Sequence, residues 1–259
     1  MIPYDHITEW RSRAPWISDH QVEQDLIISR ALVEMYRDEV LARSLAFRGG
    51  TALYKLFLLP AARYSEDIDL VQVTAGPVGA IFDRIKLRLD PWLGEPRRVQ
   101  KAGRVNLVYR VLSEDRPPRP LRLKIEINSR EHFALRGHVP VPFAVDSRWF
   151  TGDAAIRTYT IEELLATKLR ALYQRKKGRD LFDLWHACRT ITVDTASVVS
   201  LFAEYLKRDG LKVSRAEFLE NLAAKENDPT FGADVAPLLS SAVEWDIGGA
   251  FAFVRENLI

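Results

Sequence analysis

The sequence holds one cysteine among its 259 residues, Cys188, so it cannot form an internal disulfide. That cysteine has no Cys or His partners at metal-ligand spacing. No apolar run reaches the ~18 residues that a membrane-spanning helix needs. The first ten residues, MIPYDHITEW, lack the basic and then apolar segments of a signal peptide. These absences exclude a disulfide scaffold and predict a cytoplasmic protein without a membrane partner.

The sequence also has little net charge, +2, although its 47% hydrophobic and 28% charged residues are typical of a globular protein. The length suffices for one large or two small domains. Residues 97–136 hold eleven Lys and Arg against four acids, whereas residues 215–259 hold three against eight. A basic middle segment fits an anionic partner, and it equally fits a solvated strand face, so charge alone leaves both interpretations open.

Helix and strand patterns alternate in the first part of the chain, and only helical patterns follow Thr160. This organisation predicts an α+β fold, with a mixed-sheet core in residues 1–155 and a helical domain in residues 156–259. We expect a proline-rich loop at 113–120 and an irregular crossing at 137–153. The predicted helices are 20–43, 51–59, 77–89, 160–175, 180–189, 194–208, 214–226 and 246–257. The predicted strands are 44–50, 67–73, 96–101, 104–112 and 121–128.

A glycine pair, Gly49-Gly50, and then Thr51 stand between a predicted strand and a predicted helix. Glycine lets the backbone approach a phosphate closely, and a helix N-terminus favours an anion. Thr51 would cap the helix or donate its hydroxyl to a phosphate. A plain tight turn has the same pattern, so the glycine pair is not specific by itself.

Two aspartates, Asp67 and Asp69, stand one residue apart on the next predicted strand. Residues i and i+2 of a strand share a face, so both carboxylates point one way while Ile68 and Leu70 face the core. Paired carboxylates suit Mg²⁺, which is held by one or two of them together with substrate phosphates. The alternative is a strand-end cap beside a solvated acid. Following a Gly-Gly-Thr turn, the pair predicts a site for a nucleoside triphosphate and its metal.

A third carboxylate would complete a two-metal site, and Glu126 is the candidate because it is the only acid on its predicted strand. Its alternative role is a cross-strand ion pair with a nearby arginine. In the helical part, Lys168 lies within an apolar helix face, from which it would either snorkel to the edge or reach triphosphate oxygens. Asp180 follows a run of cations and would otherwise be a simple helix N-cap.

Three stretches resemble the AbiEii/AbiGii-type nucleotidyltransferase toxin family of the DNA-polymerase-β-like nucleotidyltransferase superfamily. They are FRGGTAL (47–53), RYSEDIDL (63–70) and KLRALYQRKKGRDLFDL (168–184). The resemblance implies a mixed-sheet nucleotidyltransferase core and a helical domain that contributes Lys168 and Asp180 to the cleft. It implies Mg²⁺ or Mn²⁺ at Asp67, Asp69 and, more loosely, Glu126. The implied nucleotide-binding residues are Gly49, Gly50, Thr51, Arg63, Ser65 and Lys168.

The resemblance further implies a toxin of a bacterial toxin–antitoxin or phage-defence system. Such an enzyme would add nucleotides from a nucleoside triphosphate to the 3′ end of tRNA, blocking aminoacylation, and its partner would be a separately encoded antitoxin. The basic segment 97–136 would then guide the RNA backbone. Two other functions stay open: transfer of a nucleotidyl or phosphoryl group to a protein or small-molecule hydroxyl, and a non-catalytic binding module on the same fold.

Overall fold

The computed structural model describes residues 2–101 and 104–259. The chain divides into two compact units, Met1–Tyr159 and Thr160–Ile259. The domain boundary that we predict at 155 falls inside a strand, β7, which ends at Tyr159. Within the described ranges, every helix is too short or too polar to cross a membrane.

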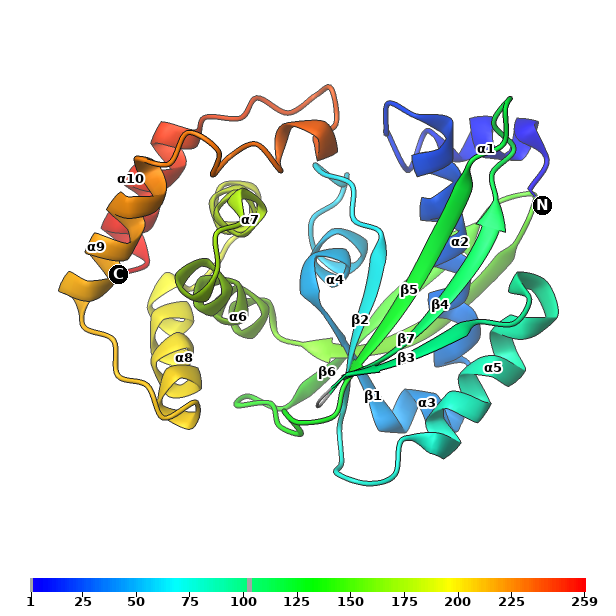
Figure 1. Ribbon diagram of the computed structural model, residues 1–259, viewed down its shortest axis with the longest axis horizontal. Coiled ribbons are helices and arrows are strands. Elements are labelled where there is room, and N and C mark those ends of the chain that lie inside the picture. Colours follow the sequence, from blue (N-terminus) through cyan, green and yellow to red (C-terminus); the bar gives the residue numbers. More distant parts are fainter. Residues whose placement is uncertain (1, 102–103) are drawn as a thin grey trace. The chain divides into compact units, whose positions relative to one another are not determined.

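The first unit contains a seven-stranded sheet with the order β3-β4-β5-β2-β1-β7-β6. The β2–β5 and β1–β7 pairs are parallel and the other pairs are antiparallel, which confirms the predicted mixed sheet (Figure 1). The strands are β1 (Leu45–Arg48), β2 (Asp67–Gln72), β3 (Arg97–Lys101), β4 (Arg104–Leu112), β5 (Pro120–Asn128), β6 (His138–Asp146) and β7 (Thr151–Tyr159).

Helices pack on this sheet, and α2 and α5 contact each other as well as strands β5 and β4, respectively. The single helix predicted over 20–43 is two helices, because α2 ends at Tyr36 and Asp38 caps the start of the next helix. Its carboxylate accepts hydrogen bonds from the backbone N–H groups of Val40 and Leu41. The helices of this unit are α1 (Tyr4–Trp10), α2 (Asp19–Tyr36), α3 (Glu39–Ser44), α4 (Gly49–Leu56) and α5 (Gly79–Leu93).

Alternation along β2 and β5 separates an apolar face from a polar one, as the sequence predicts. Ile68 and Leu70 of β2 are buried, and so are Leu121, Leu123, Ile125 and Ile127 of β5. Burying these side chains holds the two strands against the helical layer. Asp67 and Asp69 therefore point to the opposite face of the sheet.

The prediction for residues 137–153 is wrong, because most of this segment belongs to the antiparallel hairpin β6–β7. We predict an irregular segment there partly because it contains Pro140 and Pro142. They are tolerated because β6 is the edge strand of the sheet, where a missing N–H need not break a ladder. The helix that we predict to end at Leu89 continues to Leu93, and Pro91 lies within its last turn.

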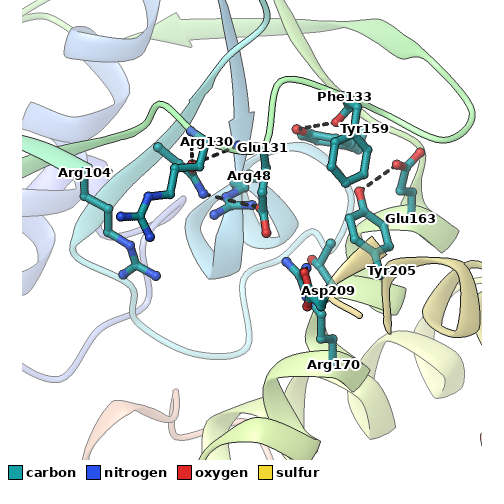
Figure 2. Close-up of polar contacts among 12 residues, drawn as sticks. Arg48, Arg104, Arg130, Glu131, Phe133, Tyr159, Glu163, Arg170, Tyr205 and Asp209 are labelled. Carbon is teal, nitrogen blue, oxygen red and sulfur yellow. Dashed lines mark hydrogen bonds and ion pairs between the residues drawn. The ribbon is translucent and has the colours of Figure 1, made fainter. Parts of the chain in front are cut away.

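The second unit is helical, and each predicted helix is present with its ends shifted by two residues at most. Tyr205 Oη donates a hydrogen bond to Glu163 Oε1 at 2.8 Å, which joins the first and third of these helices (Figure 2). Arg170 forms an ion pair with Asp209, 3.2 Å between Nη1 and Oδ2. The helices are α6 (Ile161–Gln174), α7 (Gly178–Thr190), α8 (Thr195–Arg208), α9 (Arg215–Glu226), the short 3₁₀ helix η1 (Ala236–Leu238) and α10 (Ile247–Asn257).

Candidate active site

The register of β2 and β5 brings charged side chains together on the polar face of the sheet. Asp67 lies opposite Lys124, and Asp69 lies opposite Glu126. The Lys124 ammonium is 3.0 Å from Asp67 Oδ2 and 3.1 Å from Glu126 Oε2, so it bridges two carboxylates. Burial alone would lower the pKa of Lys124, but these two carboxylates raise it.

Glu126 makes the cross-strand ion pair that we considered as its alternative role. Arg104 Nη1 on β4 is 3.2 Å from Glu126 Oε1, while Lys124 holds the other carboxylate oxygen. Both oxygens therefore have cationic partners within the protein. The role of Glu126 as a third metal ligand stays a prediction.

Asp69 differs from its neighbours because it forms no ion pair with any residue that the structure describes. Burial, and next the carboxylate of Asp67, raise the pKa of Asp69, while Arg48 acts in the opposite direction. A half-buried carboxylate beside another carboxylate is stabilised by a further cation. The donor chemistry of Asp67 and Asp69 therefore fits a hard divalent ion such as Mg²⁺ or Mn²⁺.

The glycine pair lies directly against the acidic strand. Gly49 has a φ of +81°, a conformation that favours glycine, and a Cβ atom there would collide with Asp69 Oδ2. A Cβ on Gly50 would collide with the guanidinium of Arg63. Gly49 thus requires glycine by its backbone conformation, whereas a Cβ on Gly50 would displace the end of the Arg63 side chain. The N-terminus of α4 begins beside Asp69.

Thr51 and Ser65 connect α4 to the start of β2. The Thr51 hydroxyl donates to the backbone carbonyl of Asp67 at 2.5 Å and lies 2.8 Å from Ser65 Oγ. The predicted N-cap role of Thr51 is wrong, because α4 begins at Gly49 and Arg48 occupies its N-cap position. Its hydroxyl instead fixes the backbone of Asp67, and a phosphate contact by Thr51 or Ser65 stays a prediction.

Arg63 is buried beneath the glycine turn. Its guanidinium donates to the Tyr64 carbonyl at 3.1 Å and lies 5.0 Å from the centre of the Tyr54 ring. These contacts hold the cation in one place, under Gly50. A positive charge fixed near a helix N-terminus favours phosphate, which is consistent with the nucleotide-binding role predicted for Arg63.

The sequence did not single out Arg48 and Glu131 as residues near the site. Arg48 lies opposite Asp69 on β1, and its Nη1 is 2.5 Å from Glu131 Oε2 (Figure 2). Burial alone would lower the pKa of Arg48, but Glu131 raises it. The position of Arg48 directly before the glycine pair is the one sequence signal that pointed to it.

Lys168 and Asp180 form a second charged cluster, within the helical unit. The Lys168 ammonium is 3.2 Å from Asp180 Oδ1 and 2.8 Å from Asp183 Oδ2, and Arg175 Nε is 2.7 Å from Asp180 Oδ2. Burial alone would raise the pKa of Asp180, but Lys168 and Arg175 outweigh it and lower the pKa. Asp180 lies in the first turn of α7, whose N-cap is Lys177, so the N-cap alternative is wrong.

Within residues 2–101 and 104–259, no three His, Cys, Asp or Glu side chains gather as a preformed metal centre. Of the three predicted carboxylate ligands, Asp69 has no ion pair among the described residues and Asp67 has Lys124 at one oxygen, whereas both oxygens of Glu126 face cations. A metal at Asp67 and Asp69 would therefore complete its coordination with substrate oxygens and water, as Mg²⁺ does in many phosphate-handling sites.

Comparison with known proteins gives one matching family and several similar folds. The family described as "Nucleotidyl transferase AbiEii toxin, Type IV TA system" matches residues 30–252. No curated protein matches the sequence. The structure resembles MenT4, a nucleotidyltransferase toxin from Mycobacterium tuberculosis, with a TM-score of 0.68 and 17% identity over 100% of this chain and 89% of that one. It also resembles JHP933 from Helicobacter pylori, with a TM-score of 0.55 and 18% identity over 93% and 94% of the two chains.

Proposed function

Because the chain belongs to the AbiEii nucleotidyltransferase toxin family of type IV toxin–antitoxin systems, we propose that it transfers a nucleotide from a nucleoside triphosphate to the 3′ end of tRNA. A tRNA extended in this way cannot be aminoacylated, so translation and growth stop. The family also implies an antitoxin as the partner that counteracts this enzyme.

One observation supports this proposal most: the carboxylates of Asp67 and Asp69 share a sheet face, and Gly49, at a φ that favours glycine, lies directly against Asp69. We propose that these two carboxylates hold Mg²⁺ or Mn²⁺. When bound, such an ion lowers the pKa of an attacking hydroxyl and neutralises charge on the leaving pyrophosphate. The excess of negative charge at Asp69 is what this ion would balance.

The surrounding residues would position the triphosphate. The N-terminus of α4 at Gly49 and Gly50 favours phosphate oxygens, and Arg63 beneath it adds a fixed positive charge. Thr51 holds the backbone of Asp67 and so keeps the carboxylates aligned with the turn. The 3′ oxygen of the RNA would then form its bond to the α-phosphorus while the bond to pyrophosphate breaks.

The family resemblance assigns Lys168 a contact with the triphosphate. Its ammonium is held by Asp180 and Asp183, and a triphosphate offers comparable anionic oxygens. We propose that Asp180 orients Lys168 for this contact.

The test is incubation of the purified protein with total RNA, a divalent ion and each labelled triphosphate in turn. We expect label in tRNA-sized RNA with the wild type and a loss of at least about 100-fold with Asp67→Ala, because one of two metal ligands is gone. Asp83→Ala is the matched control, since Asp83 is an exposed aspartate on α5, and it should keep full activity.

Each other outcome points to a different function. Label in protein or in a small molecule would replace tRNA by another acceptor. A folded protein that neither transfers nor binds a triphosphate would be a non-catalytic module. Growth inhibition that survives Asp67→Ala in cells would contradict the catalytic account of toxicity.

A further inference from the structure

Three exposed arginines stand on the same sheet face as Asp67 and Asp69. They are Arg97 on β3, Arg110 on β4 and Arg122 on β5. None of them forms an ion pair with a residue that the structure describes. Each therefore presents a full positive charge to solvent.

The strand register places these arginines beside the acidic site. Arg110 lies directly opposite Arg122, two residues along β5 from Lys124. One row across the sheet contains Arg97 on β3, Val108 on β4, Lys124 on β5 and Asp67 on β2, each directly opposite the next. Residues directly opposite one another share a face, and neighbouring strands are only ~4.8 Å apart. The three cations thus form an arginine track that leads to the Asp67 row.

This arrangement costs stability in the isolated protein. Like charges directly opposite on neighbouring strands repel each other, and no carboxylate in the described part of the chain forms an ion pair with Arg110 or Arg122. Other basic residues of the same strands are used internally: Arg104 pairs with Glu126, and Arg98 lies on the other face, 5.0 Å from the centre of the Phe82 ring. Among the basic side chains of β3, β4 and β5 that the structure describes, the three arginines of the track are the ones left for an anion from outside.

We propose that the arginine track of Arg97, Arg110 and Arg122 docks the phosphodiester backbone of an RNA duplex beside the acidic site. This inference rests on the proposed function, in which RNA is the acceptor. Arginine suits the role because its planar guanidinium binds phosphate with two parallel hydrogen bonds. Contacts of this kind position the duplex by its shape and leave the base sequence unread.

The test measures binding of a fluorescent RNA hairpin with a single-stranded 3′ end by anisotropy, across a range of salt concentrations. With Arg110→Gln/Arg122→Gln we expect binding to weaken about 10- to 100-fold near physiological salt. The slope of log K against log salt should fall by about two, one for each lost phosphate contact. Arg98→Gln is the matched control from the opposite face, and it should bind within twofold of the wild type.

Thermal unfolding checks that the double variant is folded, and its Tm should equal or exceed that of the wild type because a repulsion is removed. Unchanged hairpin affinity and an unchanged salt slope would overturn the proposal. So would a loss of binding to poly-L-glutamate without a loss for RNA, since the track would then fit an acidic protein.

Failure of the proposed function gives a different pattern. A wild-type protein that transfers nucleotides to a protein or small molecule, and to no RNA, would end the RNA role of the active site. Transfer to a short single-stranded RNA carrying only the 3′ end tests the track separately. The double variant should keep that transfer and lose transfer to full-length tRNA, and equal loss on both acceptors would contradict docking by the arginine track.

Discussion

The two acidic clusters of this protein share one design, in which a lysine lies between two carboxylates, but they differ in charge balance. In the helical unit, Lys168 lies between Asp180 and Asp183, and Arg175 adds a second cation. In the sheet unit, Lys124 bridges Asp67 and Glu126 and leaves Asp69 without an ion pair among the described residues. The helical cluster is balanced, whereas the sheet cluster carries excess negative charge.

Burial sharpens the difference. The side chains of Asp180 and Asp183 are 0% exposed, and the pKa of Asp180 is lowered. The side chain of Asp67 is 34% exposed, and the pKa of Asp69 is raised. Charges that a protein leaves unbalanced at an accessible place mark candidate functional sites. The sheet cluster is therefore the place for an external cation, and the helical cluster holds α6 to α7.

The largest expected effect comes from Lys168→Met. It leaves two buried aspartates with one cation between them, so the free energy of unfolding should fall by about 3–5 kcal/mol. Urea unfolding followed by circular dichroism measures it. Lys176→Met is the control, because its ammonium is mostly exposed and pairs with Asp228 at 3.4 Å, and it should change stability by less than about 1 kcal/mol. Similar losses in both variants would remove the structural role of the helical cluster.

A smaller effect is expected from Lys124→Met in the sheet cluster. Without the ammonium, Asp67 and Glu126 repel each other, and metal-free stability should fall by about 1–2 kcal/mol. Added Mn²⁺ should then raise the Tm of this variant more than it raises the Tm of the wild type, because the metal ion replaces the charge of the missing Lys124 ammonium. An equal or smaller shift would show that Lys124 and the metal do not share the carboxylates.

Local periodicity predicted much of the site. Alternation in DIDL placed Asp67 and Asp69 on one face, and alternation along 121–128 placed Lys124 and Glu126 together. The ion pairs of Lys124 with Asp67 and Glu126 could not be predicted from the sequence, because they depend on the register between two strands far apart in the chain. Asp183 was not recognised as the second partner of Lys168, because their contact depends on how α6 packs against α7. The glycine pair predicted a turn, but its contact with Asp69 is a property of tertiary packing.

The most direct test of the difference between the clusters is a Mn²⁺ titration followed by electron paramagnetic resonance, which counts free ions. The wild type should bind Mn²⁺, Asp69→Asn should bind at least about tenfold more weakly, and Asp183→Asn, checked for native circular dichroism, should bind like the wild type. Mn²⁺ binding that is unchanged by Asp69→Asn, or lost in a folded Asp183→Asn variant, would contradict the assignment of the metal to the sheet cluster.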